Sequence, residues 1–156
     1  MTMPSITVLT QLDPLTYRAI CELLPQLTAS SRLPTYSELS EIVDAPCTRL
    51  LVARDGNQLL GMLTLVLVRL PSACVAHVED VVVDEVSRGK GVGRLLLDAS
   101  LTLATEAGAT HVDLTSRPAR TAANGLYQSL GFVLRETNVY RYAIRGERTP
   151  TTGVSR

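Results

Sequence analysis

His77-Val78-Glu79-Asp80-Val81-Val82-Val83-Asp84, followed after three intervening residues by Arg88-Gly89-Lys90-Gly91-Val92-Gly93-Arg94, is the stretch around which the rest of the chain is organised. Its β-branched run favours a strand, its glycines favour a turn, and the leucines that follow recur at helical spacing. A helix that begins on glycines leaves backbone N–H groups unshielded beside the positive end of its dipole. The stretch therefore predicts an anion site, for which phosphate is the usual ligand.

The sequence of this glycine-rich turn does not match either of two well-known phosphate-binding motifs. A Walker A loop continues Gly-Lys with Ser or Thr, whereas Gly89-Lys90 is followed by Gly91. The dinucleotide fingerprint needs a third glycine where this chain has Arg94. Binding of ATP or NAD through this loop is the weakest of the hypotheses.

A third loop fits at every position. Arg88-Gly89-Lys90-Gly91-Val92-Gly93 matches the Arg/Gln-x-x-Gly-x-Gly/Ala pyrophosphate loop of the GNAT family of N-acetyltransferases, which this chain resembles. Ala123, Tyr127, Gly131 and Phe132 match that family's Ala-x-x-x-Tyr-x-x-x-Gly-Phe ending. The resemblance covers roughly residues 48 to 144. It implies a single-domain α/β acyl-CoA N-acyltransferase fold, in which helices flank a mixed central sheet whose fourth and fifth strands splay apart.

The resemblance also implies acetyl-CoA as cosubstrate and an amine as acceptor. Pantetheine would lie along the fourth strand, and the pyrophosphate in the glycine loop. Arg120 stands where the family often has a cofactor-contacting asparagine, and Asn124, on the same helical face as Tyr127, is the expected substitute. The alternative is that Arg120 itself approaches the phosphates or the substrate. The implied cofactor-binding residues are Val81, Val82, Val83, Arg88, Gly89, Lys90, Gly91, Val92, Gly93, Arg94, Asn124 and Tyr127.

The resemblance also supplies positions for three candidates in acid–base catalysis, because family members carry bases at the positions that match His77 and Glu79 and a tyrosine at the position that matches Tyr127. Glu79 is the leading candidate for the general base, and His77 is the alternative, because an imidazole ordinarily titrates near neutral pH. Two-residue periodicity puts His77, Glu79, Val81 and Val83 on one strand face, unless a bulge changes the register. Tyr127 is the candidate acid for the departing thiolate. The alternatives without a catalytic role are that Glu79 and Asp80 are solvated charges at a strand end and that Tyr127 is a packed aromatic ring.

Direct transfer in a ternary complex is expected, because no cysteine occupies a motif position. The competing hypothesis is a CoA-binding or CoA-sensing module of the same fold that does not turn over. Cys21, Cys47 and Cys74 are odd in number and widely spaced, so neither a disulfide framework nor a metal site is expected. Homodimerisation is expected from the family resemblance.

Composition restricts the class of protein further. The chain has 156 residues, of which 46% are hydrophobic, and a formal net charge of zero. These values predict one globular domain, expected over residues 1–145. Residues 146–156 are polar and include Pro150 and Gly153, so a mobile tail is expected there. Balanced charge without interleaved aromatic and basic residues disfavours nucleic acid. Without a signal-peptide pattern or a long apolar span, neither a membrane partner nor export is expected, and the expected location is cytoplasmic.

The remaining elements are predicted from local signals. Asp13-Pro14 predicts a helix start, Thr35-Tyr36-Ser37-Glu38 has the pattern of a capping box, and Asp55-Gly56-Asn57 predicts a hairpin turn. Gly108 and Gly131 are expected to end helices. The expected strands span residues 6–10, 49–54, 58–69, 111–115, 132–134 and 139–144, the last two as a hairpin, and the expected helices include residues 14–24, 36–43 and 121–130.

Overall fold

The computed structural model describes residues 3–29 and 32–144. The chain forms two compact units, Met1–Ala119 and Arg120–Arg156, each of which is described by itself. The expected tail over residues 146–156 lies outside the described residues.

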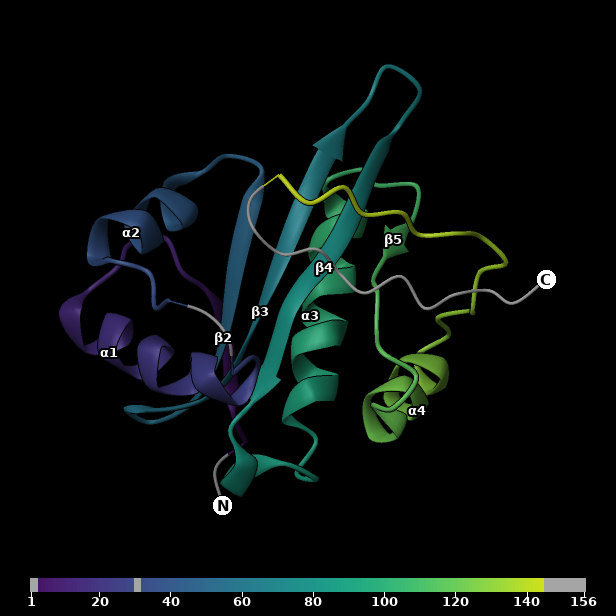
Figure 1. Cartoon of the computed structure of the whole chain (residues 1–156). Helices are drawn as coiled ribbons and strands as arrows, with labels where there is room; N and C mark the ends of the chain where they lie inside the picture. The colour runs from purple at the N-terminus through teal and green to yellow at the C-terminus, as the bar shows by residue number, and fades with distance from the viewer. Residues whose placement is uncertain (1–2, 30–31, 145–156) are drawn as a thin grey trace. The chain divides into compact units, whose positions relative to one another are not determined.

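The first unit is built on a mixed β-sheet, as the resemblance implied (Figure 1). Its strands lie in the order β1 (Ser5–Val8), β2 (Thr48–Asp55), β3 (Gln58–Arg69), β4 (Cys74–Val83) and β5 (Val112–Asp113). Pairing is antiparallel from β1 to β4 and parallel between β4 and β5. The hairpin predicted at Asp55-Gly56-Asn57 joins β2 to β3, and Gly56 has the positive φ of 57° that such a turn requires.

Helices cover both faces of this sheet (Figure 1). On one face lie α1 (Pro14–Leu23), the short 3-10 helix η1 (Leu24–Gln26) and α2 (Tyr36–Asp44). On the other lies α3 (Val92–Glu106), which follows the 3-10 turn η2 (Glu85–Ser87). The predicted caps are confirmed: Asp13 accepts hydrogen bonds from the first backbone N–H groups of α1, and Thr35 and Glu38 form a capping box at α2.

Polar contacts join α1 to α2 above the sheet. The Tyr17 hydroxyl donates to the Pro34 carbonyl at 3.0 Å, and the Tyr36 hydroxyl donates to the Leu12 carbonyl at 2.6 Å. The two tyrosine rings meet edge to face with centroids 5.4 Å apart. A cluster of apolar side chains from these helices and from β2, β3 and β4 forms the core on this face and includes Ile20, Leu23, Leu39, Val52, Met62 and Val82. These contacts hold the helix pair in place over one face of the sheet.

A β-bulge interrupts β4 and corrects the expected strand face. Met62 pairs with Val82, but Thr64 pairs with Glu79, so two β4 residues, Asp80 and Val81, lie opposite one β3 residue. Asp80 has φ 48°, and it is the single non-glycine residue with positive φ in the described part of the chain. A bulge adds one residue to one strand and so reverses the alternation beyond it.

The prediction that His77, Glu79, Val81 and Val83 share a face is therefore wrong. Paired residues and next-but-one residues share a face, so Glu79 lies with Val82 on the α1–α2 face. Val83 pairs with Gly61, whose missing Cβ position faces Leu96 of α3, and so it lies on the opposite face. Val81 lies within the bulge.

The second unit contains α4 (Thr121–Ser129), and Gly131, with φ 93°, directly follows its C-cap residue Leu130. The hairpin predicted over residues 132–144 is wrong, because no strand forms in that described stretch. Thr137-Asn138 lacks the glycine that favours a two-residue turn, and an isolated hairpin is at best marginally stable. Several of its large hydrophobic side chains are at least 75% exposed: Val133, Leu134, Val139, Tyr140, Tyr142 and Ile144.

Candidate active site

The open edge of β4 is the first component of the site. β5 pairs with β4 only at Ala76–Val112 and His77–Asp113 in the described residues, so the two strands part beyond His77. Val78 to Val83 thereby present backbone N–H and C=O groups on that edge without a strand partner among the described residues. This is the splay that the resemblance implied, and an extended chain could hydrogen-bond along it.

The glycine loop and the start of α3 form the second component. Gly91 is the N-cap residue with φ 81°, and no side chain of the described residues caps the helix there. A Cβ at Gly89 or Gly91 would have no described heavy atom within 4 Å, so the space over the loop is open. Uncapped N–H groups at a helix start bind anions. Arg88 and Lys90 add positive charge beside them, so the residues present fit a pyrophosphate.

Gln26, the last residue of η1, fixes the residues that lead into this loop, which could not be foreseen from the sequence. Its side-chain nitrogen donates to Asp84 Oδ1 at 2.9 Å, and its side-chain oxygen accepts from the Glu85 backbone N–H at 2.9 Å. The Arg88 guanidinium donates to the Val83 carbonyl at 3.1 Å and to the same Gln26 oxygen at 3.5 Å. The end of η1 is thus tied directly to the loop.

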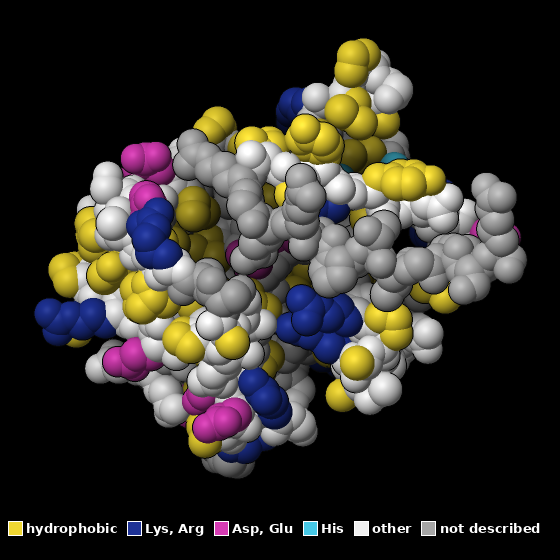
Figure 2. Space-filling model, in the orientation of Figure 1, with side chains coloured by type: hydrophobic (Ala, Val, Ile, Leu, Met, Phe, Trp, Pro, Cys, Tyr) yellow, Lys and Arg dark blue, Asp and Glu magenta, His cyan; other side chains and the backbone are white. Residues whose placement is uncertain are grey.

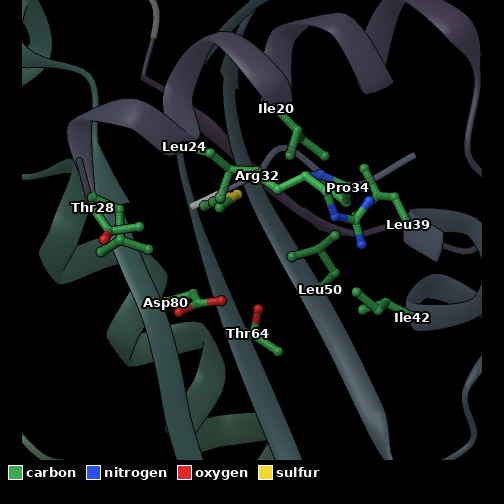
Figure 3. Close-up of a pocket in the computed structure, with 12 residues that line it drawn as sticks. Ile20, Leu24, Thr28, Arg32, Pro34, Leu39, Ile42, Leu50, Thr64 and Asp80 are labelled. Atoms are coloured by element: carbon green, nitrogen blue, oxygen red, sulfur yellow. The ribbon is translucent and has the colours of Figure 1, made fainter. Parts of the chain in front are cut away.

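A pocket of about 330 Å³ lies between the α1–α2 helices and strands β2 to β4 (Figure 3). Asp80 and Thr64 point into it from neighbouring strands, and Ile20, Leu24 and Leu39 line the helix side. The sequence alone suggested only a solvated strand-end charge for Asp80. In a regular strand the residue after Glu79 would turn to the α3 face; the bulge instead aims the Asp80 carboxylate into the pocket.

Arg32 also lines the pocket, with its charge already paired. Its guanidinium donates to both Glu38 carboxylate oxygens, at 3.0 Å and 2.7 Å. This hydrogen-bonded pairing, helped by the Thr35 backbone N–H, lowers the pKa of Glu38 to about 2. Asp80, by contrast, has no hydrogen-bond or ion-pair partner within residues 3–29 and 32–144. Asp80 therefore supplies the uncompensated charge among the pocket's lining residues.

The two base candidates lie on the same strand face as the pocket. Glu79 pairs with Thr64, which lines the pocket, and His77 pairs with Val66 two residues further along β3. Glu79 is exposed and His77 is half-buried. Either group can therefore reach solvent water, which a base acting through water requires.

Tyr127, the candidate acid, lies on α4 in the second unit. Its ring is half-buried and meets the Phe132 ring edge to face with centroids 6.0 Å apart. Burial raises the pKa of Tyr127 above 10, and the charge of Arg120 opposes that shift in part. The hydroxyl therefore stays protonated at neutral pH, as a proton donor must. Asn124, expected to contact the cofactor, is half-buried one turn earlier on the same helix.

Every helix among the described residues falls short of the length and apolarity needed to cross a bilayer. Within the same residues, no group of three or more histidine, cysteine, aspartate or glutamate side chains is arranged to hold a metal ion.

Comparison with known proteins identifies the family. The family model described as acetyltransferase (GNAT) family matches residues 17–132, which is most of the chain. The chain belongs to this family. The GNAT family uses acetyl-CoA as cosubstrate. The glycine loop is of a type that binds phosphate groups, and the open β4 edge is of a type that hydrogen-bonds an extended chain. None of the curated proteins compared with the chain matches it.

Solved structures agree in fold at low sequence identity. An aminoglycoside acetyltransferase from an uncultured soil metagenomic sample, in complex with trehalose, has a TM-score of 0.80 at 20% identity, over 92% of this chain and 97% of that one. A Trypanosoma brucei acetyltransferase has a TM-score of 0.74 at 24% identity, over 90% and 99%. Glucosamine-6-phosphate N-acetyltransferase from Arabidopsis thaliana has a TM-score of 0.70 at 20% identity, over 88% and 98%.

Proposed function

We propose that the protein is an acetyl-CoA-dependent N-acetyltransferase that moves the acetyl group directly to a primary amine. One observation carries this proposal: in the first unit, the open edge of β4 leads into a glycine loop at an uncapped helix start, and the bulge of the same strand lines a separate pocket. A single strand thus serves two binding regions, one suited to acetyl-CoA and one suited to an acceptor. Direct transfer needs both bound at once.

The cosubstrate half uses residues 81–94. The backbone of Val81, Val82 and Val83 pairs with the pantetheine arm, while the Val82 side chain remains in the core. The N–H groups at the start of α3 hold the pyrophosphate, and Arg88 and Lys90 balance its charge. Glycine at position 91 keeps the space over the loop open.

The chemical step requires two proton transfers. Glu79, or His77 in its place, takes a proton from the acceptor ammonium, directly or through water, so that the nitrogen lone pair can attack the thioester carbonyl carbon. As the new C–N bond forms and the C–S bond breaks, Tyr127 gives its proton to the sulfur. The second proton lost by the nitrogen restores Tyr127, so the net products are the amide, CoA thiol and one proton.

Calorimetric titration with acetyl-CoA, with ATP and NAD as controls, tests the cosubstrate site. A matched pair of variants, Gly91→Glu and Gly91→Gln, adds the same bulk and the same strain at a positive φ. Only Gly91→Glu adds negative charge beside the pyrophosphate position. We expect acetyl-CoA binding without ATP or NAD binding, and a loss of affinity that is much larger for Gly91→Glu. Equal losses in both variants, or preferred binding of ATP or NAD, would contradict the proposed site.

The competing proposal is a GNAT-fold module that binds CoA without turnover. Assays of Glu79→Gln and Tyr127→Phe separate the two, because a non-catalytic module has no turnover for either change to reduce. Loss of at least 100-fold in kcat, which is the low end for a positioned acid or base, is expected from Tyr127→Phe. An activity that neither change reduces would rule out these residue roles.

We further propose that the protein is a homodimer. The exposed hydrophobic side chains of residues 133–144 support this proposal, because large apolar surface exposed in this way is commonly covered in an assembly. A solution mass equal to that of one 16.9 kDa chain would contradict it.

A further inference from the structure

The pocket over the β4 bulge has the size of a small-molecule site. Its volume of about 330 Å³ lies at the low end of the range for ligand pockets. At about 30 Å³ for each molecule in liquid water, it has room for roughly ten non-hydrogen atoms. A compact acceptor, or one end of a larger acceptor, fits this space.

Its walls are mostly apolar. Leu24, Leu39, Leu50 and Met62 belong to the lining, and all pack in or against the core on the α1–α2 face. Hydrophobic side chains also gather on the molecular surface over these helices (Figure 2), and the exposed ones in this part of the chain include Leu33, Tyr36 and Ile42. An acceptor with an apolar body would gain burial here, whereas a polyhydroxylated sugar would lose hydrogen bonds to water.

The charge of the pocket is set by Asp80. Arg32 is neutralised by its two hydrogen bonds to Glu38, whereas the Asp80 carboxylate has no partner among the described residues. Asp80 is held in the left-handed region at φ 48° by the bulge, so the strand aims this carboxylate in a conformation that only glycine, asparagine and aspartate adopt routinely. A lone carboxylate opposite an apolar wall complements a single ammonium group and repels a phosphate.

Resting on the acetyltransferase function proposed above, we propose that the acceptor is a small primary amine with one positive charge and an apolar carbon body. Its ammonium group binds Asp80 beside Thr64, and its carbon chain lies against the helix wall. Asp80 is then a substrate-binding residue, distinct from the base that takes the proton. Sugar phosphates and polycationic aminoglycosides are poor acceptors in this arrangement.

Binding of n-hexylamine to the protein tests this proposal without any turnover. Amide chemical-shift changes are recorded in the absence of acetyl-CoA for the unaltered chain, for Asp80→Asn, and for Asp44→Asn. Asparagine keeps the shape of the side chain and tolerates the left-handed backbone. Asp44→Asn is the matched control, because it removes the same charge from an exposed residue at the end of α2 that is not part of the pocket lining.

We expect shifts at the pocket residues of α1, α2 and β3, and an affinity about tenfold lower in Asp80→Asn, as befits one charged hydrogen bond at an exposed carboxylate. Asp44→Asn should bind like the unaltered chain. Equal binding by all three proteins, or shifts outside the pocket, would overturn the assignment. The acetyl-CoA titration above is independent, so failure of the cosubstrate site and failure of this acceptor assignment are distinguishable.

A kinetic series gives a second test through thiol release with n-alkylamines of increasing length. Each added methylene should raise kcat/KM about fourfold until the pocket is filled. Ile42→Trp, which adds bulk at the exposed rim of the lining, should shorten the best chain, while Leu15→Trp, at an exposed position outside the lining, should not. A flat length series, or faster turnover of glucosamine 6-phosphate than of hexylamine, would overturn the proposal.

Discussion

The side-chain oxygen of Gln26 accepts a hydrogen bond from the backbone N–H of Glu85 at 2.9 Å, across 59 residues of chain. Gln26 ends η1, whose Leu24 lines the pocket over the β4 bulge, and Glu85 opens the turn that leads into the glycine loop. A single side chain therefore connects the wall of that pocket with the backbone that leads into the loop.

Replacing Gln26 with alanine should weaken acetyl-CoA binding about three- to tenfold, because two hydrogen bonds that fix the loop are lost. Calorimetric titration measures the dissociation constant. Gln58→Ala, at an exposed position beside the β2–β3 turn, is the control. An unchanged dissociation constant together with a lowered melting temperature would mean that Gln26 supports the fold alone.

Replacing Tyr127 with phenylalanine should remove the alkaline limb of the pH–rate profile. Burial raises the pKa of Tyr127 above 10, so its proton stays available through neutral pH and is lost only as the pH rises beyond that value. The rate of the unaltered enzyme should therefore fall only above about pH 10. Tyr140→Phe, 87% exposed in the same unit, is the control. A decline that persists in Tyr127→Phe would assign it to another group.

The Arg32–Glu38 pair should make stability depend on pH in the acid range. Hydrogen bonding by Arg32 lowers the folded-state pKa of Glu38 to about 2 from an ordinary value of 4.5. The folded state then binds this proton less readily than the unfolded state, so the contribution is complete above pH 4.5 and is lost as the pH falls toward 2. Urea midpoints of the unaltered chain and Glu38→Gln should therefore converge on acidification. Glu41→Gln, exposed on the same helix, should show no such convergence.

Gly61 and Gly125 should respond to alanine in opposite directions. A Cβ at Gly61 would lie 2.8 Å from the Val82 carbonyl oxygen, so Gly61→Ala should lower the free energy of unfolding by about 1–3 kcal/mol. Gly125 lies inside α4 with no described atom within 4 Å of the new Cβ, and there alanine should add about 0.5–1 kcal/mol. Urea unfolding measures both. A neutral Gly61→Ala would contradict the close approach of β3 to the bulged β4.

The elements of the first unit were predictable because each is encoded by its neighbours in sequence. Asp13 and Thr35 are typical N-cap residues that predict helix starts, and Gly56 predicts a hairpin turn. The glycine loop was recognisable for the same reason. The hairpin predicted over residues 132–144 failed because alternating apolar residues favour an extended chain without specifying its partner.

The bulge and its consequences could not be predicted from the pattern. Three consecutive valines, Val81 to Val83, are compatible with either strand register. Only the pairing with β3 decides which of them packs in the core, and that residue is Val82. The sequence suggests that Asp80 is a strand-end charge, whereas in the structure its backbone has φ 48° and its side chain lines the pocket. Gln26 gave no local signal, since its partners lie 58 and 59 residues away.

The brief pairing of β5 with β4 has a consequence for handling the protein. Over the described residues the parallel ladder ends at His77, and the remaining backbone of β4 is an edge that another strand could join. Whatever occupies this edge also shields it from a second chain. Acetyl-CoA should therefore act as a solubilising additive, and ligand-free protein should aggregate sooner on concentration or storage than protein kept saturated with it.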